Sequence, residues 1–121
     1  MEKKSFGFKE LAVWQRALEF ANKVIELCES LNTNTKHFRL IEQIESAAAS
    51  VSQNIAEGKG RYSGKEFKQF LYYSRGSLYE AITLLNLFAL QGWITKDQLA
   101  QLENEADEIG KMINGLINSI R

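Results

Sequence analysis

The stretch TKDQLAQLENEADEIGKMINGLINSI, residues 95–120, decides the fold of this chain. Its apolar side chains recur at alternating intervals of three and four residues, which places them along one face of an α-helix. The members of this seam are Leu99, Leu102, Ala106, Ile109, Ile113, Leu116 and Ile120. Thr95 and Gln98 have the spacing of a capping box at a helix start. The stretch therefore predicts a helix over about residues 96–120 with a regular heptad seam.

The same spacing predicts three further helices, over about residues 9–31, 38–58 and 64–91. Short polar residues at 32–35 predict a turn between the first two, and Ser63 with Glu66 predicts a capping box for the third. The chain contains no proline, the strongest helix breaker. Four helices of similar length joined by short turns predict one all-α domain over residues 1–121, an up-down-up-down antiparallel four-helix bundle.

The composition excludes several classes of protein. An apolar fraction of 45% with 25% charged residues is that of a globular domain rather than a disordered chain. No apolar stretch is long enough for a signal peptide or a membrane span, so we expect a cytoplasmic protein that does not bind a membrane. Because 15 basic residues balance 15 acidic ones, no net charge attracts polyanions to the molecule as a whole.

Residue types that carry metal or covalent chemistry are scarce in this chain. Its one histidine, His37, is expected to be exposed on a turn, and no Glu-x-x-His pair occurs. Its one cysteine, Cys28, shares an apolar helix face with Ala21 and Ile25, which predicts a buried, inert thiol. No glycine-rich phosphate loop and no Ser-His-Asp set can be assembled. We therefore expect no metal, no cofactor and no catalytic residue, and a protein that is not an enzyme.

Basic and aromatic residues are interleaved in the third predicted helix and the turn before it. One helix face, opposite the apolar seam, carries Lys65, Lys68, Tyr72, Arg75 and Tyr79. Such a face can neutralise phosphates and stack exposed bases, although a solvated helix face has the same composition. The candidate nucleic-acid-binding residues are Lys59, Arg61, Lys65, Lys68, Tyr72 and Arg75.

The first predicted helix is apolar over a little more than half of its circumference. Its core-facing residues are expected to be Leu11, Trp14, Leu18, Ala21, Ile25 and Cys28, and a second apolar stripe lies beside them. A small bundle that left the second stripe in water would expose an unusually large apolar patch, which favours self-association. The alternative is that the first and third helices are the more buried members of a monomer. The candidate interface residues are Val13, Phe20, Val24, Leu27, Tyr73, Leu84 and Leu87.

A motif in the middle of the chain resembles a known family. The string NIAEG at residues 54–58 is followed by Gly60-Arg61, Glu66-Phe67 and Gly76-Ser77-Leu78, and preceded by Gln43-Ile44 and by FKEL with Val13-Trp14 near the start. With these residues the chain resembles the four-helix bundle proteins encoded within intervening sequences of bacterial 23S rRNA genes, also labelled S23 ribosomal proteins. The resemblance covers essentially the whole chain.

The resemblance implies an all-helical bundle that assembles as a ring-like homopentamer. It also implies a relationship to the accessory variability determinant of diversity-generating retroelements, a basic pentamer that engages nucleic acid and a reverse transcriptase. The polar residues of the family signature fall on Asn54, Glu57, Arg61 and Glu66. This chain departs from the family at Ser52, where a proline is usual, and at Glu45 and Ser46, where arginines are common. The latter departures reduce the positive surface.

Three functional hypotheses follow from these patterns. The first is a non-enzymatic, homo-oligomeric bundle that associates with RNA or DNA through its basic-aromatic face. The second is a protein-interaction or structural scaffold on which the basic face is incidental. The third is an enzyme that uses Glu57 and Arg61, whose spacing of four also allows a simple ion pair along the helix. Zero net charge is the main argument against the first hypothesis.

Overall fold

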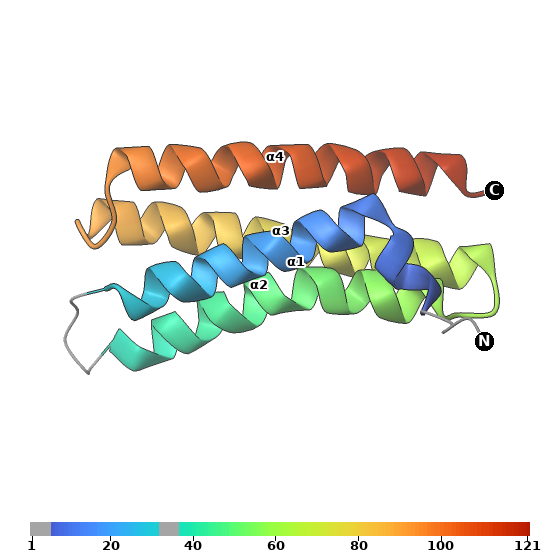
Figure 1. Ribbon diagram of the computed structural model, residues 1–121, viewed down its shortest axis with the longest axis horizontal. Coiled ribbons are helices and arrows are strands. Elements are labelled where there is room, and N and C mark those ends of the chain that lie inside the picture. The colour runs from blue at the N-terminus through green and yellow to red at the C-terminus, as the bar shows by residue number, and fades with distance from the viewer. Residues whose placement is uncertain (1–5, 32–36) are drawn as a thin grey trace, which may run out of the picture.

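The structure, a computed structural model, describes residues 6–31 and 37–121, and every regular element within them is helical. A 3-10 turn, η1 (Gly7–Glu10), precedes four long helices: α1 (Ala12–Glu29), α2 (Phe38–Lys59), α3 (Gly64–Leu90) and α4 (Lys96–Ser119). Figure 1 shows these helices side by side, each antiparallel to the one before it. The predicted four-helix bundle is therefore confirmed. The turn predicted at residues 32–35 lies outside the described residues.

The start of the first helix differs from the prediction. Instead of a continuous helix from Lys9, the chain forms η1 and then passes through Leu11 in an extended conformation, with φ −72° and ψ 122°. Two contacts hold this bend. The Phe8 and Trp14 rings pack edge to face with their centroids 5.2 Å apart, and Gln15 Nε2 donates to the Lys9 carbonyl at 2.7 Å. Helical periodicity alone could not show the bend, because these contacts link residues on either side of it.

Local side-chain caps set the starts of α3 and α4. Ser63 Oγ accepts a hydrogen bond from the Glu66 backbone N–H at 3.2 Å. Thr95 and Gln98 form the full reciprocal box, with Gln98 N–H to Thr95 Oγ1 at 3.0 Å and Thr95 N–H to Gln98 Oε1 at 2.8 Å. Each N-cap of this kind contributes about 1 kcal/mol, because it satisfies a backbone donor that the helix leaves free. The box predicted at Thr95 is complete, whereas at Ser63 only the half that caps Glu66 is present.

The inner face of α1 is only partly the predicted one: Ala21 and Cys28 are buried as predicted, but the core extends to the second apolar stripe. The structure buries the stripe that contains Val13, Ala17, Phe20 and Val24, while Leu18, predicted to face the core, is 47% exposed. Phe20 joins the centre of the core with Phe88, and both side chains are fully buried. The two apolar stripes of α1 are adjacent, so a rotation of the helix by about one residue exchanges them. The positions of α2 and α4 decide which stripe is buried.

This rotation overturns the basis of the predicted oligomer interface. Val13, Phe20, Val24 and Leu84 are buried in the core of a single chain, so in this fold they cannot contact another copy. Leu27 and Leu87 are partly buried against the same core. Tyr73, which is 51% exposed, is the one candidate that lies mostly on the surface. The alternative considered above, that α1 and α3 are the more buried members of the bundle, explains the wide apolar arcs.

Helices α2 and α3 approach each other closely because small residues line their contact. A Cβ on Gly58 would lie 2.7 Å from the Phe70 Cβ, a distance that real side chains do not adopt. Ser74 Oγ donates to the Val51 carbonyl at 2.7 Å, and the hydroxyls of Ser50 and Ser77 lie 2.8 Å apart. Polar groups buried between the two helices are therefore satisfied by each other.

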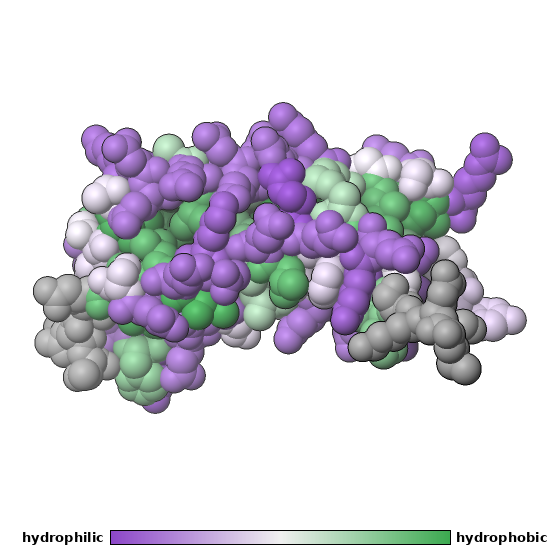
Figure 2. All heavy atoms as spheres, in the orientation of Figure 1, coloured by the Kyte–Doolittle hydropathy of each residue, from purple (hydrophilic) through white to green (hydrophobic). Residues whose placement is uncertain are grey.

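Charged side chains join α4 to α1 along the face seen in Figure 2, which hydrophilic side chains largely cover. Arg16 forms an ion pair with Glu108, and Lys23 forms one with Glu105. Two acidic residues of α4 are thus paired with cations of α1. None of the described helices is long and apolar enough to cross a membrane.

Candidate nucleic-acid interface

The candidate nucleic-acid-binding residues lie at one end of the bundle and along the adjoining half of α3. We call this set the basic-aromatic face; it comprises Lys59, Arg61, Lys65, Lys68, Tyr72 and Arg75. Its end of the bundle holds the turn between α2 and α3, at the right of Figure 1. Lys68 and Arg75 are half-buried and the other members are exposed. Lys65, Lys68, Tyr72 and Arg75 thus share one flank of α3, whereas Lys59 and Arg61 lie at the end of the bundle, over Phe67 and Phe70.

Aromatic rings support three of the cations of this face. The Arg61 guanidinium carbon lies 4.5 Å from the centroid of the Phe70 ring, and that of Arg75 lies 4.9 Å from the Tyr72 ring. Lys59 Nζ lies 5.9 Å from the Phe67 ring. Contacts of this geometry attract a cation to the ring face and restrict where a long side chain places its charge.

The position of Arg75 corrects the predicted orientation of the stripe. Its Nη1 donates to Asn114 Oδ1 of α4 at 2.9 Å, so the stripe runs beside α4 instead of directly opposite the core. The reason is that α4 packs against α3 on the flank that carries Lys68, Arg75 and Ile82, all of which are half-buried. The basic-aromatic face thus borders the groove between the two helices.

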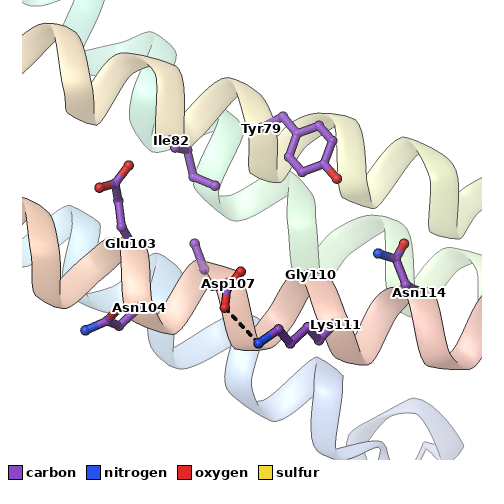
Figure 3. Close-up of a pocket in the computed structure, with 9 residues that line it drawn as sticks. Tyr79, Ile82, Glu103, Asn104, Asp107, Gly110, Lys111 and Asn114 are labelled. Atoms are coloured by element: carbon purple, nitrogen blue, oxygen red, sulfur yellow. Dashed lines mark ion pairs between the residues drawn. The ribbon is translucent and has the colours of Figure 1, made fainter.

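This groove becomes acidic beyond Arg75. Figure 3 shows Tyr79 of α3 above a cavity of about 410 Å³ whose α4 side carries Glu103, Asp107 and Lys111. Asp107 and Lys111 form an ion pair at 3.1 Å, and Asn86 Nδ2 donates to Glu103 Oε2 at 2.9 Å. Carboxylates at this position repel phosphate, so they mark the limit of the anion-attracting surface along α3.

The family signature proves to be largely structural. Asn54 Nδ2 donates to the Ser50 carbonyl at 2.8 Å and to Ser50 Oγ at 2.9 Å, at the contact of α2 with α3. Ile55 is fully buried, and Gly58 permits the close approach to Phe70. The NIAEG string therefore builds the α2–α3 contact, and of its polar residues only Glu57 is exposed.

The ion pair considered for Glu57 and Arg61 does not form between these described residues. Arg61 stacks on Phe70 instead. Glu66 lies in the first turn of α3, where its backbone N–H and its carboxylate both bond to Ser63. The four polar positions of the signature consequently do not converge on a common centre that could act on a substrate.

Cys28 is buried where its thiol is unreactive, and His37 packs beside Trp93. Cys28 is buried, and burial, together with the charge of Glu45, raises the pKa of its thiol to about 12. A thiol with that pKa is not a nucleophile at neutral pH, as the sequence predicted. His37 differs from its prediction: it is half-buried, with its ring 4.6 Å from that of Trp93. No cluster of three metal-ligating side chains occurs in residues 6–31 and 37–121.

Two surface features escaped the sequence reasoning. The first is Tyr62, whose side chain is fully exposed in the turn between α2 and α3. The second is an apolar groove of about 580 Å³ between α1 and α2, lined by Leu18, Ala21, Ile25 and Ala49 with Ser52. A tyrosine between Arg61 and Ser63 was a visible signal for the first feature. The sequence does not indicate the groove, because the periodicity of α1 predicts that Leu18 faces the core.

The fold defines a class: an all-α antiparallel four-helix bundle. The chain belongs to the 23S rRNA-intervening sequence protein family, whose model matches residues 9–115. It is also similar to a solved structure from Bacteroides thetaiotaomicron VPI-5482, a protein with unknown function from the S23 ribosomal protein family. That chain is 27% identical, with a TM-score of 0.81 over 88% of this chain and 98% of the other. No match was found among curated proteins.

Proposed function

We propose that this protein is a non-enzymatic, homo-oligomeric bundle of the bacterial cytoplasm that binds RNA or DNA through the basic-aromatic face. The observation that carries the proposal is the support of Lys59, Arg61 and Arg75 by aromatic rings. Cations that are already placed lose less side-chain entropy when a phosphate binds. Exposed Tyr72 adds a ring on which a base can stack.

The zero net charge does not oppose this proposal, because the positive and negative charges are unevenly distributed over the molecule. Residues 59–75 contain five cations and one acid, Glu66. Glu105 and Glu108 of α4 are paired with Lys23 and Arg16 on α1. Exposed charges farther apart than about 8 to 10 Å are largely screened at physiological salt, so the local excess governs contact with phosphate.

Self-association is the second part of the proposal, and the groove between α1 and α2 is the surface we assign to it. Leu18 is 47% exposed there, and the floor is formed by Ala21 and Ala49. A second copy of this chain is the occupant that the homopentamer implied by the sequence resemblance requires. Repetition of the basic-aromatic face by symmetry would multiply the five cations of each chain.

Salt-dependent binding tests the nucleic-acid part. Fluorescence anisotropy with a labelled, structured fragment of 23S rRNA should give affinities that fall with salt, with a slope of log K against log salt of about −4 for five cations. The variant with Lys65→Glu and Lys68→Glu should lose most of this binding. A matched variant with Arg39→Glu and Lys96→Glu, at the opposite end of the bundle, should retain it. Binding that is independent of salt, or equal losses in both variants, would show that the basic-aromatic face is not the interface.

A protein-interaction scaffold is the second candidate, and the apolar groove favours it. Of the residues that line this groove, only Glu19 carries a charge, and Leu18, Ala21, Ile25 and Ala49 present apolar surface. If the protein self-associates through Leu18 but binds no RNA or DNA even at low salt, the scaffold is the better account. Light scattering and anisotropy on the same preparation distinguish the two.

A further inference from the structure

Tyr62 exposes an aromatic ring in the turn between α2 and α3, where a small polar residue would be enough to keep the turn soluble. Its side chain is fully exposed, although tyrosine rings usually bury much of their apolar area. The turn that carries it spans only residues 60–63 between α2 and α3. Both sides of the turn are held: Arg61 N–H donates to the Gly58 carbonyl at 3.0 Å, and Ser63 caps Glu66. The ring is therefore presented to solvent on a short, well-supported turn.

Basic residues flank Tyr62 on both sides in the sequence. Lys59 and Arg61 precede Tyr62 and Lys65 follows it, and all three side chains are exposed. Lys59 and Arg61 lie over Phe67 and Phe70, so the aromatic surface beneath them is already occupied. Tyr62 consequently offers an open ring face within a basic stretch of the chain. A flat apolar surface bordered by cations fits a base together with its flanking phosphates.

We infer that Tyr62 stacks on an unpaired base, so that the basic-aromatic face binds single-stranded nucleic acid in preference to a duplex; this inference rests on the proposed function. In a duplex the base faces are covered by their neighbours, and an exposed ring can reach only the backbone or a groove. The turn at residues 60–63 is too short to enter a groove as a helix or a two-stranded ribbon would. In a single strand the base faces are accessible, and stacking on an aromatic ring tolerates any sequence.

Competition among three probes tests the inference with the full chain. The probes are an unstructured RNA of about 12 nucleotides, the same strand paired with its complement, and a strand of equal length that lacks bases. Wild type should bind the first most tightly. Tyr62→Ala should weaken that binding by about 5-fold to 100-fold, whereas Tyr62→Phe, which keeps the ring, should remain within about twofold of wild type. Binding of the duplex and of the strand without bases should be the same in wild type and Tyr62→Ala.

Phe38→Ala is the matched control, because Phe38 is an exposed aromatic residue at the opposite end of the bundle, 53% exposed. It should bind every probe as wild type does. Equal affinity of wild type for single strand and duplex, or an unchanged affinity of Tyr62→Ala for the single strand, would overturn the inference while leaving salt-dependent binding by the lysines intact. Absence of any binding to all three probes at low salt would overturn the proposed function and the inference with it.

Discussion

Arg75 of α3 and Asn114 of α4 are joined by a hydrogen bond of 2.9 Å from the guanidinium to the amide oxygen. On its other side, the same guanidinium lies 4.9 Å from the centroid of the Tyr72 ring. A long side chain is thus held between a ring of its own helix and an amide of the neighbouring one. Its charge is positioned before any ligand arrives, which is the form of preorganisation that lowers the cost of binding.

Asn114→Ala should separate the positioning of Arg75 from its charge. The lost hydrogen bond should lower the free energy of unfolding by about 1 kcal/mol in a urea titration. Affinity for single-stranded RNA should fall by about twofold to tenfold, because Arg75 must then be ordered during binding. Asn118→Ala, an exposed position on the same helix, is the control and should change neither quantity. If Arg75→Ala weakens binding but Asn114→Ala does not, the charge acts without being positioned.

Gly58→Ala should destabilise the contact between α2 and α3. The added Cβ would lie 2.7 Å from the Phe70 Cβ and 2.9 Å from Phe67 Cδ1, so the helices must move apart at a cost of about 1 to 3 kcal/mol. Gly76→Ala is the opposite case, because nothing lies within 4 Å of its Cβ position and the residue is exposed on α3. It should stabilise the protein by about 0.5 to 1 kcal/mol through helix propensity. Urea denaturation of both variants checks the pair, and equal stabilities would contradict the close approach.

The helices could be predicted from sequence because their signals are local. Heptad spacing and the caps at Ser63 and Thr95 depend on residues only a few positions apart. The inner face of α1 could not be predicted, because Leu18 and Phe20 belong to adjacent apolar stripes of similar strength. Phe20 is fully buried because α2 and α4 pack on its side of the helix, which is a tertiary effect that helical periodicity does not contain.

The candidate site shows the same division between local and tertiary information. The three-four spacing of Lys65, Lys68 and Arg75 puts them on one flank of α3, as helix geometry requires. The contacts that position them join distant segments: Arg61 stacks on Phe70, and Arg75 reaches Asn114, 39 residues away. The stripe therefore lies beside α4, a position that no pattern within α3 could indicate.

Cys28 gives a prediction about alkaline pH. Its thiol pKa is raised from 9.0 in an ordinary setting to about 12 in the fold, so the unfolded chain releases the proton at a lower pH than the folded chain does. The free energy of unfolding should therefore fall as pH rises from about 9 to about 12, and this group should contribute no slope below pH 9. Urea titrations across that range should show a shallower slope for Cys28→Ala. Every other titratable group is common to both proteins, so identical slopes would show that burial does not raise this pKa.

Leu18→Asp tests the surface assigned to self-association. Leu18 is 47% exposed in the groove between α1 and α2, so a charge there should leave the bundle folded but disrupt an apolar contact with a second copy. Light scattering should then give the mass of a single chain, while wild type gives a multiple of it.

Leu90→Asp is the matched control, because Leu90 is 84% exposed at the end of α3 and does not line the groove, so it should keep the wild-type mass. Circular dichroism should show unchanged helix content in both variants, which separates loss of assembly from loss of fold. A wild-type mass for Leu18→Asp would exclude the groove as the interface, and a single-chain mass for wild type would exclude self-association itself.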